Sequence, residues 1–253
     1  MWLVLCDPHD HAALWAGSQL RSLGLMPVQF VAPQELLLAS RLEYCAEVST
    51  KAYAYAQLQG DRVIDTRSVH GTINRAVRLN CPQVGVAATQ DRSYVQAEMD
   101  AIMLAWLAAL SARAINPATA SAWSGVQLSA FAWAQHAQAA GFTTLPYRCG
   151  HAGLEHPPAL NCQLSTHLVF AEETYPALPS TLASAAIQLA KRVRVPLLGI
   201  TLGWHTPNFG PKDARHANFI DANTLPDLRV GGTAFIAALA ASLMAATPSR
   251  GRT

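Results

Sequence analysis

The first forty residues constrain the fold most, because short apolar runs alternate there with helical periodicity. Residues 2–6 form an uninterrupted apolar run, which is typical of a strand buried on both faces. Residues 10–23 place apolar side chains at helical spacing, and a second strand and helix follow at 26–31 and 33–38. This strand–helix–strand–helix order predicts an α/β fold with a parallel sheet and helices on its faces.

A hairpin is expected after this unit. Gly60-Asp61 forms a turn signal between two β-prone segments, 54–58 and 62–64, and 44–48 is a further strand candidate. A long helix is then expected from Ser93 to about Arg113. Asn116-Pro117 ends that unit, because the residue before a proline avoids the helical region. We therefore expect two structural units, 1–117 and 118–253.

The second unit is expected to mix helices and strands around a loop-like stretch at 149–161. Its expected elements are helices at 124–140, 182–191 and 231–245 and strands at 142–147, 163–170, 195–201 and 218–222.

Composition excludes several classes of protein. The 253 residues are 51% apolar and 13% charged, so the chain can bury a large core and is not disordered. A net charge of +2 without a basic run argues against nucleic acid. Five scattered cysteines without a Cys-x-x-Cys pair, and a start without a basic leader, predict a cytoplasmic protein. The apolar stretches 101–110 and 234–246 are short and alanine-rich, so we expect no membrane span.

A strand near the C-terminus carries the most specific chemistry. The segment 219–227 reads Phe-Ile-Asp-Ala-Asn-Thr-Leu-Pro-Asp and precedes an apolar helix. Strand alternation places Asp221 and Asn223 on the same side, with Ile220 and Ala222 on the other. Their side-chain oxygens can converge on one hard cation, usually Mg²⁺.

Several segments line up in order with the RimK-like carboxylate–amine ligases of the ATP-grasp superfamily. The chain resembles them at Asp7 and Asp10 before the first helix, and in the segments His70–Arg75, Ile115–Pro117, Gly141–Pro146, Leu198–Thr201 and Asp221–Asn223. The resemblance implies a Rossmann-like pre-ATP-grasp domain followed by an ATP-grasp region. It also implies ATP and Mg²⁺ as cofactors, with the metal site at Thr201, Asp221 and Asn223.

The chain departs from this family at the nucleotide site. The family holds phosphates with a lysine on each of two strands, and the matching stretch 147–165 contains no lysine. Thr201 replaces the family's metal aspartate, Asp221 replaces a glutamate, and the interval between Pro146 and the helix near 182 is too short for a normal nucleotide-binding lobe. We therefore expect a truncated, degenerate pseudo-ligase without a cofactor. It would be an accessory or binding subunit in a cofactor or peptide-modification pathway. The alternative is a compact ligase that uses ATP and Mg²⁺.

Other candidate sites have a plainer alternative. His9 and His11, beside Cys6, could bind a transition metal, or Cys6 could be buried while Asp7 and Asp10 end a strand and cap a helix. A second group, Cys149, His151, His156, Cys162 and His167, has no standard zinc spacing and favours a solvated loop.

The remaining candidates are polar groups for a cleft. Arg75 and Arg78, beside Asn74, could bind an anion, or they could be surface arginines at a helix start. His205 is either a loop residue or a cleft residue. A small molecule, a peptide, a protein partner or a second copy of the chain could be the ligand, although core packing explains the alanine-rich helix faces equally well.

Overall fold

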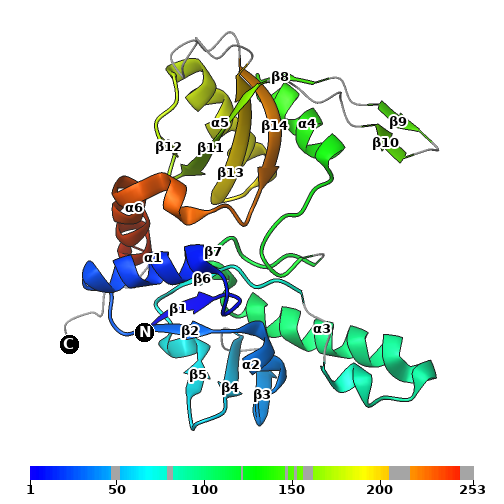
Figure 1. Ribbon diagram of the computed structural model, residues 1–253. Helices are drawn as coiled ribbons and strands as arrows, with labels where there is room; N and C mark the ends of the chain where they lie inside the picture. The colour runs from blue at the N-terminus through cyan, green and yellow to red at the C-terminus, as the bar shows by residue number, and fades with distance from the viewer. Residues whose placement is uncertain are drawn as a thin grey trace. The chain divides into compact units, whose positions relative to one another are not determined.

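The computed structural model describes residues 1–46, 52–78, 82–120, 122–145, 148–150, 153–155, 162–204 and 217–245 (Figure 1). It contains two compact units. The first comprises Met1–Val126 together with Leu239–Thr253, and the second comprises Gln127–Ala238.

A four-stranded parallel sheet forms the centre of the first unit. Its order is β2 (Val28–Val31), β1 (Trp2–Leu5), β6 (Gly71–Asn74) and β7 (Ala114–Ile115). All four residues of β1 are buried, as expected for a strand that is covered on both faces. The first helix, α1 (His11–Ser22), begins at Asp10, whose carboxylate accepts a hydrogen bond from Ala13 N. The parallel α/β arrangement predicted from the first forty residues is confirmed.

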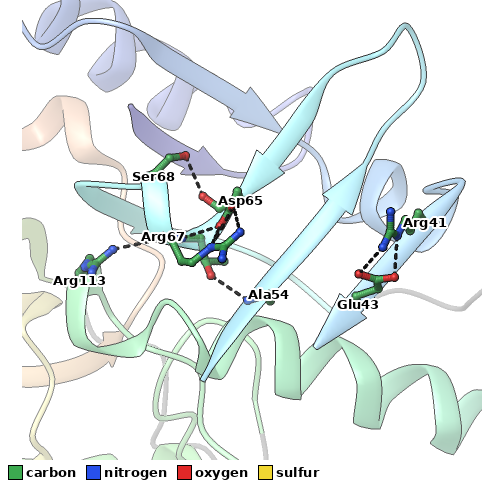
Figure 2. Close-up of polar contacts among 8 residues, drawn as sticks. Arg41, Glu43, Ala54, Asp65, Arg67, Ser68 and Arg113 are labelled. Carbon is green, nitrogen blue, oxygen red and sulfur yellow. Dashed lines mark hydrogen bonds and ion pairs between the residues drawn. The ribbon is translucent and has the colours of Figure 1, made fainter. Parts of the chain in front are cut away.

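A second, three-stranded antiparallel sheet belongs to the same unit (Figure 2). Its order is β3 (Arg41–Cys45), β4 (Tyr53–Gln57) and β5 (Val63–Asp65). Ala54, Ala56 and Ile64 are fully buried on its inner face. They join a core with Leu3, Leu5 and Trp106.

The long helix of the first unit is shorter than expected. Helix α3 runs from Arg92 to Ala108, not to Arg113, and a 3-10 turn leads from it into β7. Arg113 closes this 3-10 turn, and its guanidinium donates to the carbonyls of Thr66 and Val69 at 3.1 and 2.7 Å. The unit also contains α2 (Pro33–Leu37) and the 3-10 helices η1 (Thr66–Ser68), η2 (Pro82–Gly85), η3 (Thr89–Asp91) and η4 (Ser111–Arg113).

The expected boundary at Asn116-Pro117 lies inside the first unit. The buried Asn74 amide donates to the Asn116 carbonyl at 2.9 Å and to the Trp123 carbonyl at 2.6 Å. These two bonds attach the chain on both sides of Pro117 to the end of β6. The first compact unit continues to Val126, and the second begins at Gln127.

The second unit is a mixed five-stranded sheet with two helices packed on it. The order is β12 (Glu173–Tyr175), β11 (Gln163–Phe170), β13 (Leu197–Trp204), β14 (Ala217–Asn223) and β8 (Thr143–Thr144). Helices α4 (Ala130–Ala139) and α5 (Ser180–Val193) pack against each other and against the strands. The expected helix at 124–140 begins later, because Ser129 caps it.

The stretch expected to be a loop contains a short hairpin. Strands β9 (Arg148–Gly150) and β10 (Gly153–Glu155) pair antiparallel, so the loop expectation for 149–161 is wrong at these residues.

The C-terminal helix is strongly apolar. After η6 (Leu228–Gly231), α6 covers Gly232–Ala245, and Leu228–Ala245 is long and apolar enough to cross a membrane, with a mean hydropathy of 1.6. The expectation that the apolar stretch at 234–246 is too short to span a membrane is therefore wrong, because the apolar segment begins at Leu228. A core helix meets the same criterion, and Phe235, Ile236 and Leu239 are buried here.

Candidate functional site

Thr201 and Asp221 lie directly opposite each other in the antiparallel pair of β13 and β14. The register shifts between Thr201 and Leu202, so β14 contains one extra residue, Ile220. Ile220 and Cys162 occupy the space beside Gly203, where an added Cβ would lie 3.0 and 2.9 Å from their nearest atoms. The bulge next to Asp221 was not expected from the sequence.

Asp221 and Asn223 are both exposed, while Ala222 between them is buried. The Asn223 side-chain oxygen accepts a hydrogen bond from Leu225 N at 3.1 Å, which closes the turn into Pro226. Pro226 packs against Gly199, where an added Cβ would lie only 2.5 Å from the proline Cβ. The Leu198–Thr201 and Asp221–Asn223 segments are thus held together by a turn that only glycine at position 199 accommodates.

Although Asp221 is exposed as a residue, its carboxylate is partly desolvated, which raises its pKa, and a hydrogen bond from the backbone N–H of Ala222 opposes this shift. No arginine or lysine of the described chain contributes to it. Among the residues that the structure describes, the carboxylate therefore has no cationic side chain that lowers its pKa.

This donor set does not fit a resident Mg²⁺ ion. One carboxylate, one neutral hydroxyl and an amide oxygen already bonded to Leu225 N provide little charge for a hard cation. Across the described part of the chain, no three His, Cys, Asp or Glu side chains converge on a common point.

The structure does not assemble Asn74, Arg75 and Arg78 into one anion site. Arg75 is 7% exposed, and its Nε lies 2.6 Å from Asp10 Oδ2, so the expectation of a surface arginine is wrong here. Arg78 is 65% exposed and pairs with Asp100. The Asn74 side-chain amide already donates to the backbone carbonyls of Asn116 and Trp123. The Asp10–Arg75 ion pair could not have been predicted from local sequence, because its two residues come from segments far apart in the chain.

Cys6, His9 and His11 do not form a metal site: Cys6 is buried and Asp10 caps α1. Burial raises the pKa of the Cys6 thiol to about 11, and a protonated thiol is a poor metal ligand. His9 and His11 are exposed. Asp7 accepts a hydrogen bond from His9 N at 2.8 Å.

Most of the second cysteine–histidine group cannot be placed. The side chains of Cys149, His151 and His156 lie outside the described residues, as does His205. His167 is buried, and its Nδ1 lies 2.9 Å from the Pro176 carbonyl.

His167 belongs to a polar network that the sequence did not reveal. Because the Pro176 carbonyl can only accept, His167 Nδ1 carries the hydrogen and Nε2 accepts from Ser165 Oγ at 3.0 Å. Trp204 Nε1 donates to the same Oγ at 2.8 Å. Alternation along β11 placed Ser165 and His167 on one face, but only tertiary structure brings Trp204 to them.

Comparison with known proteins identifies the fold. No family model matches the chain, and no curated protein sequence matches it. The macrocyclase MdnC from Microcystis aeruginosa MRC, bound with the precursor peptide MdnA, superposes with a TM-score of 0.68 at 11% identity, covering 96% of this chain and 98% of that one. The chain has an ATP-grasp-like fold.

Two further solved structures agree. A RiPP-associated ATP-grasp ligase from Chryseobacterium gregarium, in complex with ADP and a leader and core peptide, gives a TM-score of 0.66 at 9% identity and covers 98% of each chain. The ATP-grasp ligase PsnB, complexed with precursor peptide PsnA2 and AMPPNP, gives 0.66 at 11% identity, covering 96% of this chain and 97% of that one. The similarity therefore extends over nearly the whole of both chains in each pair.

Proposed function

We propose that this protein is a pseudo-ligase with an ATP-grasp-like fold. It acts as a non-catalytic accessory or binding subunit in a cytoplasmic peptide-modification pathway. The observation that carries the proposal is the pairing of Thr201 with Asp221. A neutral hydroxyl stands where the family resemblance implies a second metal-binding carboxylate, so the catalytic cation lacks a ligand.

The electrostatics of the second unit support the same proposal. MgATP brings several negative charges that a ligase must neutralise with cationic side chains. Lys191 lies 2.9 Å from Glu172, and Arg229 binds Asp227 at 2.6 Å, so both are already paired, while Arg192 and Arg194 lie together at the exposed end of α5. Between β8 and β11, the described residues contain only one hairpin of two three-residue strands. The 17 residues from 146 to 162 are few for a nucleotide-binding lobe.

A peptide is the ligand class that we propose. The three proteins compared above were all crystallised with peptides, two of them named as precursors. A fold that no longer binds nucleotide can still position a peptide for a partner enzyme, because peptide docking needs surface complementarity and not phosphate neutralisation.

A compact ligase is the second candidate. It is favoured by the exposed Asp221 carboxylate, which is available to a cation, and by similarity across nearly all of both chains. In that case ATP and Mg²⁺ would be used despite the weak donor set.

Peptide binding and ligation can be tested together. The protein is mixed with synthetic peptides encoded by neighbouring genes, with and without MgATP, and binding and product mass are measured. The proposal predicts binding that nucleotide does not change, and no loss of one water from any peptide. A dehydrated product that forms only with MgATP and disappears in Asp221→Ala would establish the ligase instead.

A further inference from the structure

Strand β3 is the edge of the three-stranded sheet in the first unit. The sheet order β3-β4-β5 leaves one side of this five-residue strand without a neighbouring strand among the described residues. The opposite edge, β5, has only three residues before the chain turns into η1. An exposed edge strand is a ready template for another strand.

Hydrogen-bond alternation identifies which residues of β3 face outward. Leu58 N donates to the Arg62 carbonyl at 2.8 Å across the β4–β5 turn. The backbone N–H and C=O groups of every second residue of β4 therefore point toward β5. Those of the residues between them, Tyr55 and Gln57, point toward β3. Ser40 N bonds the Gln57 carbonyl at 2.9 Å, which agrees.

By the same alternation, the backbone of Arg41 and Glu43 faces β4, and the backbone of Leu42 and Tyr44 faces the free edge. Apart from the strand ladder, no backbone hydrogen bond within the described ranges involves Leu42 or Tyr44.

We propose that the occupant of this edge is a second copy of the same chain, paired antiparallel along β3 about a two-fold axis through Leu42. The proposal is independent of the proposed function. The hydrogen-bond alternation allows only registers in which outward-facing residues meet outward-facing residues. An axis through Arg41 or Glu43 also meets this condition, but it places two like charges opposite each other.

Among registers that pair only residues of β3, the axis at Leu42 is the one that brings opposite charges together, so charge selects it. In this register Arg41 lies opposite the partner's Glu43, and Glu43 lies opposite the partner subunit's Arg41. Both are non-hydrogen-bonded pairs, in which side chains approach most closely, and opposite charges there stabilise the sheet.

The charges are already positioned for this pairing (Figure 2). Arg41 binds Glu43 through two hydrogen bonds of 2.6 and 3.0 Å, and its guanidinium lies 5.2 Å from the Tyr55 ring centroid. Their side chains are 58% and 39% exposed, so both remain accessible. Across the axis, four alternating charges would form one network on the outer face of a continuous six-stranded sheet.

One exposed large apolar side chain belongs to the same edge strand. Tyr44 is 39% exposed. With the axis at Leu42, Tyr44 lies opposite the partner's Ser40 and diagonal to the partner subunit's Leu42, so pairing covers its ring.

Charge reversal tests the interface. The full chain, of 27.1 kDa, is examined by light scattering and sedimentation over a concentration series. We expect a dimer of about twice this mass. Arg41→Glu should weaken it at least tenfold, because four carboxylates would then meet, and the swap R41E/E43R should restore it.

The other edge provides a matched control. Arg67 pairs with Asp65 two residues away, as Arg41 pairs with Glu43 (Figure 2). Its guanidinium lies 4.2 Å from the Tyr53 ring centroid, and that of Arg41 lies 5.2 Å from the Tyr55 ring centroid. Arg67→Glu creates the same local repulsion and should leave the dimer intact. A monomeric wild type, or a double swap that fails to recover the dimer while remaining folded, overturns the proposal.

Cross-linking tests the register even if a charge variant unfolds. In a Cys45→Ser background, Leu42→Cys should form an intermolecular disulfide, because facing residues of a hydrogen-bonded pair have Cα atoms about 5.5 Å apart. Tyr44→Cys should not, because the two copies of that position are about 14 Å apart along the strands. The opposite pattern excludes the axis at Leu42.

Discussion

Thr201 faces Asp221 across the β13–β14 ladder, and a bulge immediately follows this pair. Two carboxylates at these facing positions could share a cation. Here one member is neutral, so the other is a partly desolvated carboxylate without a counter-charge among the described residues. This relationship gives the first prediction.

Asp221→Asn should stabilise the folded protein at neutral pH. The folded-state pKa of Asp221 is raised above its ordinary value of 3.8, so the ionised form is less favourable in the folded chain than in the unfolded chain. We expect the unfolding midpoint at pH 7 to rise by roughly 1–3 °C. The difference should shrink as pH falls through the raised pKa and vanish below about 3.8.

Thermal unfolding across this pH range measures the effect. Glu98→Gln, at an exposed position on α3, is the control and should change little. A lower midpoint for Asp221→Asn at neutral pH would show that the carboxylate makes a stabilising contact.

Arg75→Met should destabilise the first unit by about 3 kcal/mol, because it leaves the partly buried Asp10 carboxylate without its partner. Asp10 also caps α1, so the loss should reduce protection of that helix. Arg78→Met removes an arginine that is 65% exposed, and Asp100 keeps a hydrogen bond from the Gln96 side chain, so this loss should cost less than about 1 kcal/mol. Chemical denaturation of both variants provides the comparison, and equal losses would contradict the assignment.

The contrast between these arginines shows where sequence reasoning ends. The periodicity of residues 2–38 was sufficient for the parallel sheet, because strand and helix periods are local properties. Nothing local distinguishes Arg75 from Arg78. Their fates depend on Asp10 and Asp100, which the fold brings to them from distant segments.

His167 predicts a pH dependence in the second unit. Burial lowers its pKa, and the hydrogen bond to the Pro176 carbonyl opposes this shift only in part. The unfolded chain therefore takes up a proton near pH 6.5 while the folded chain does not, so stability falls as pH drops below 6.5 toward the lowered pKa. The loss should have a slope of at most about 1.4 kcal/mol per pH unit.

Denaturation of His167→Gln between pH 7.5 and 5 tests this point. The substitution should lower stability at neutral pH and remove this part of the pH dependence. His9→Gln, at an exposed position, should leave the profile unchanged. An unaltered slope in His167→Gln would mean that the ring is not kept neutral by burial.

The candidate site was only partly predictable. Alternation placed Asp221 and Asn223 on one side, and the structure has both exposed with Ala222 buried between them. The bulge at Ile220 and the packing of Pro226 on Gly199 could not be predicted, because both depend on the partner strand and the following turn. His205 lies outside the described residues, so its role stays a prediction.

Calorimetric titration with ATP in the presence and absence of Mg²⁺ tests the central claim most directly. The pseudo-ligase account predicts no binding tighter than about 1 mM, or roughly −4 kcal/mol. Thr201→Asp, which restores a carboxylate opposite Asp221, should increase Mg²⁺ affinity without creating tight nucleotide binding, because no lysine lies in 147–165. Micromolar MgATP binding by the wild-type chain, lost in Asp221→Ala, would contradict the account and establish a compact ligase.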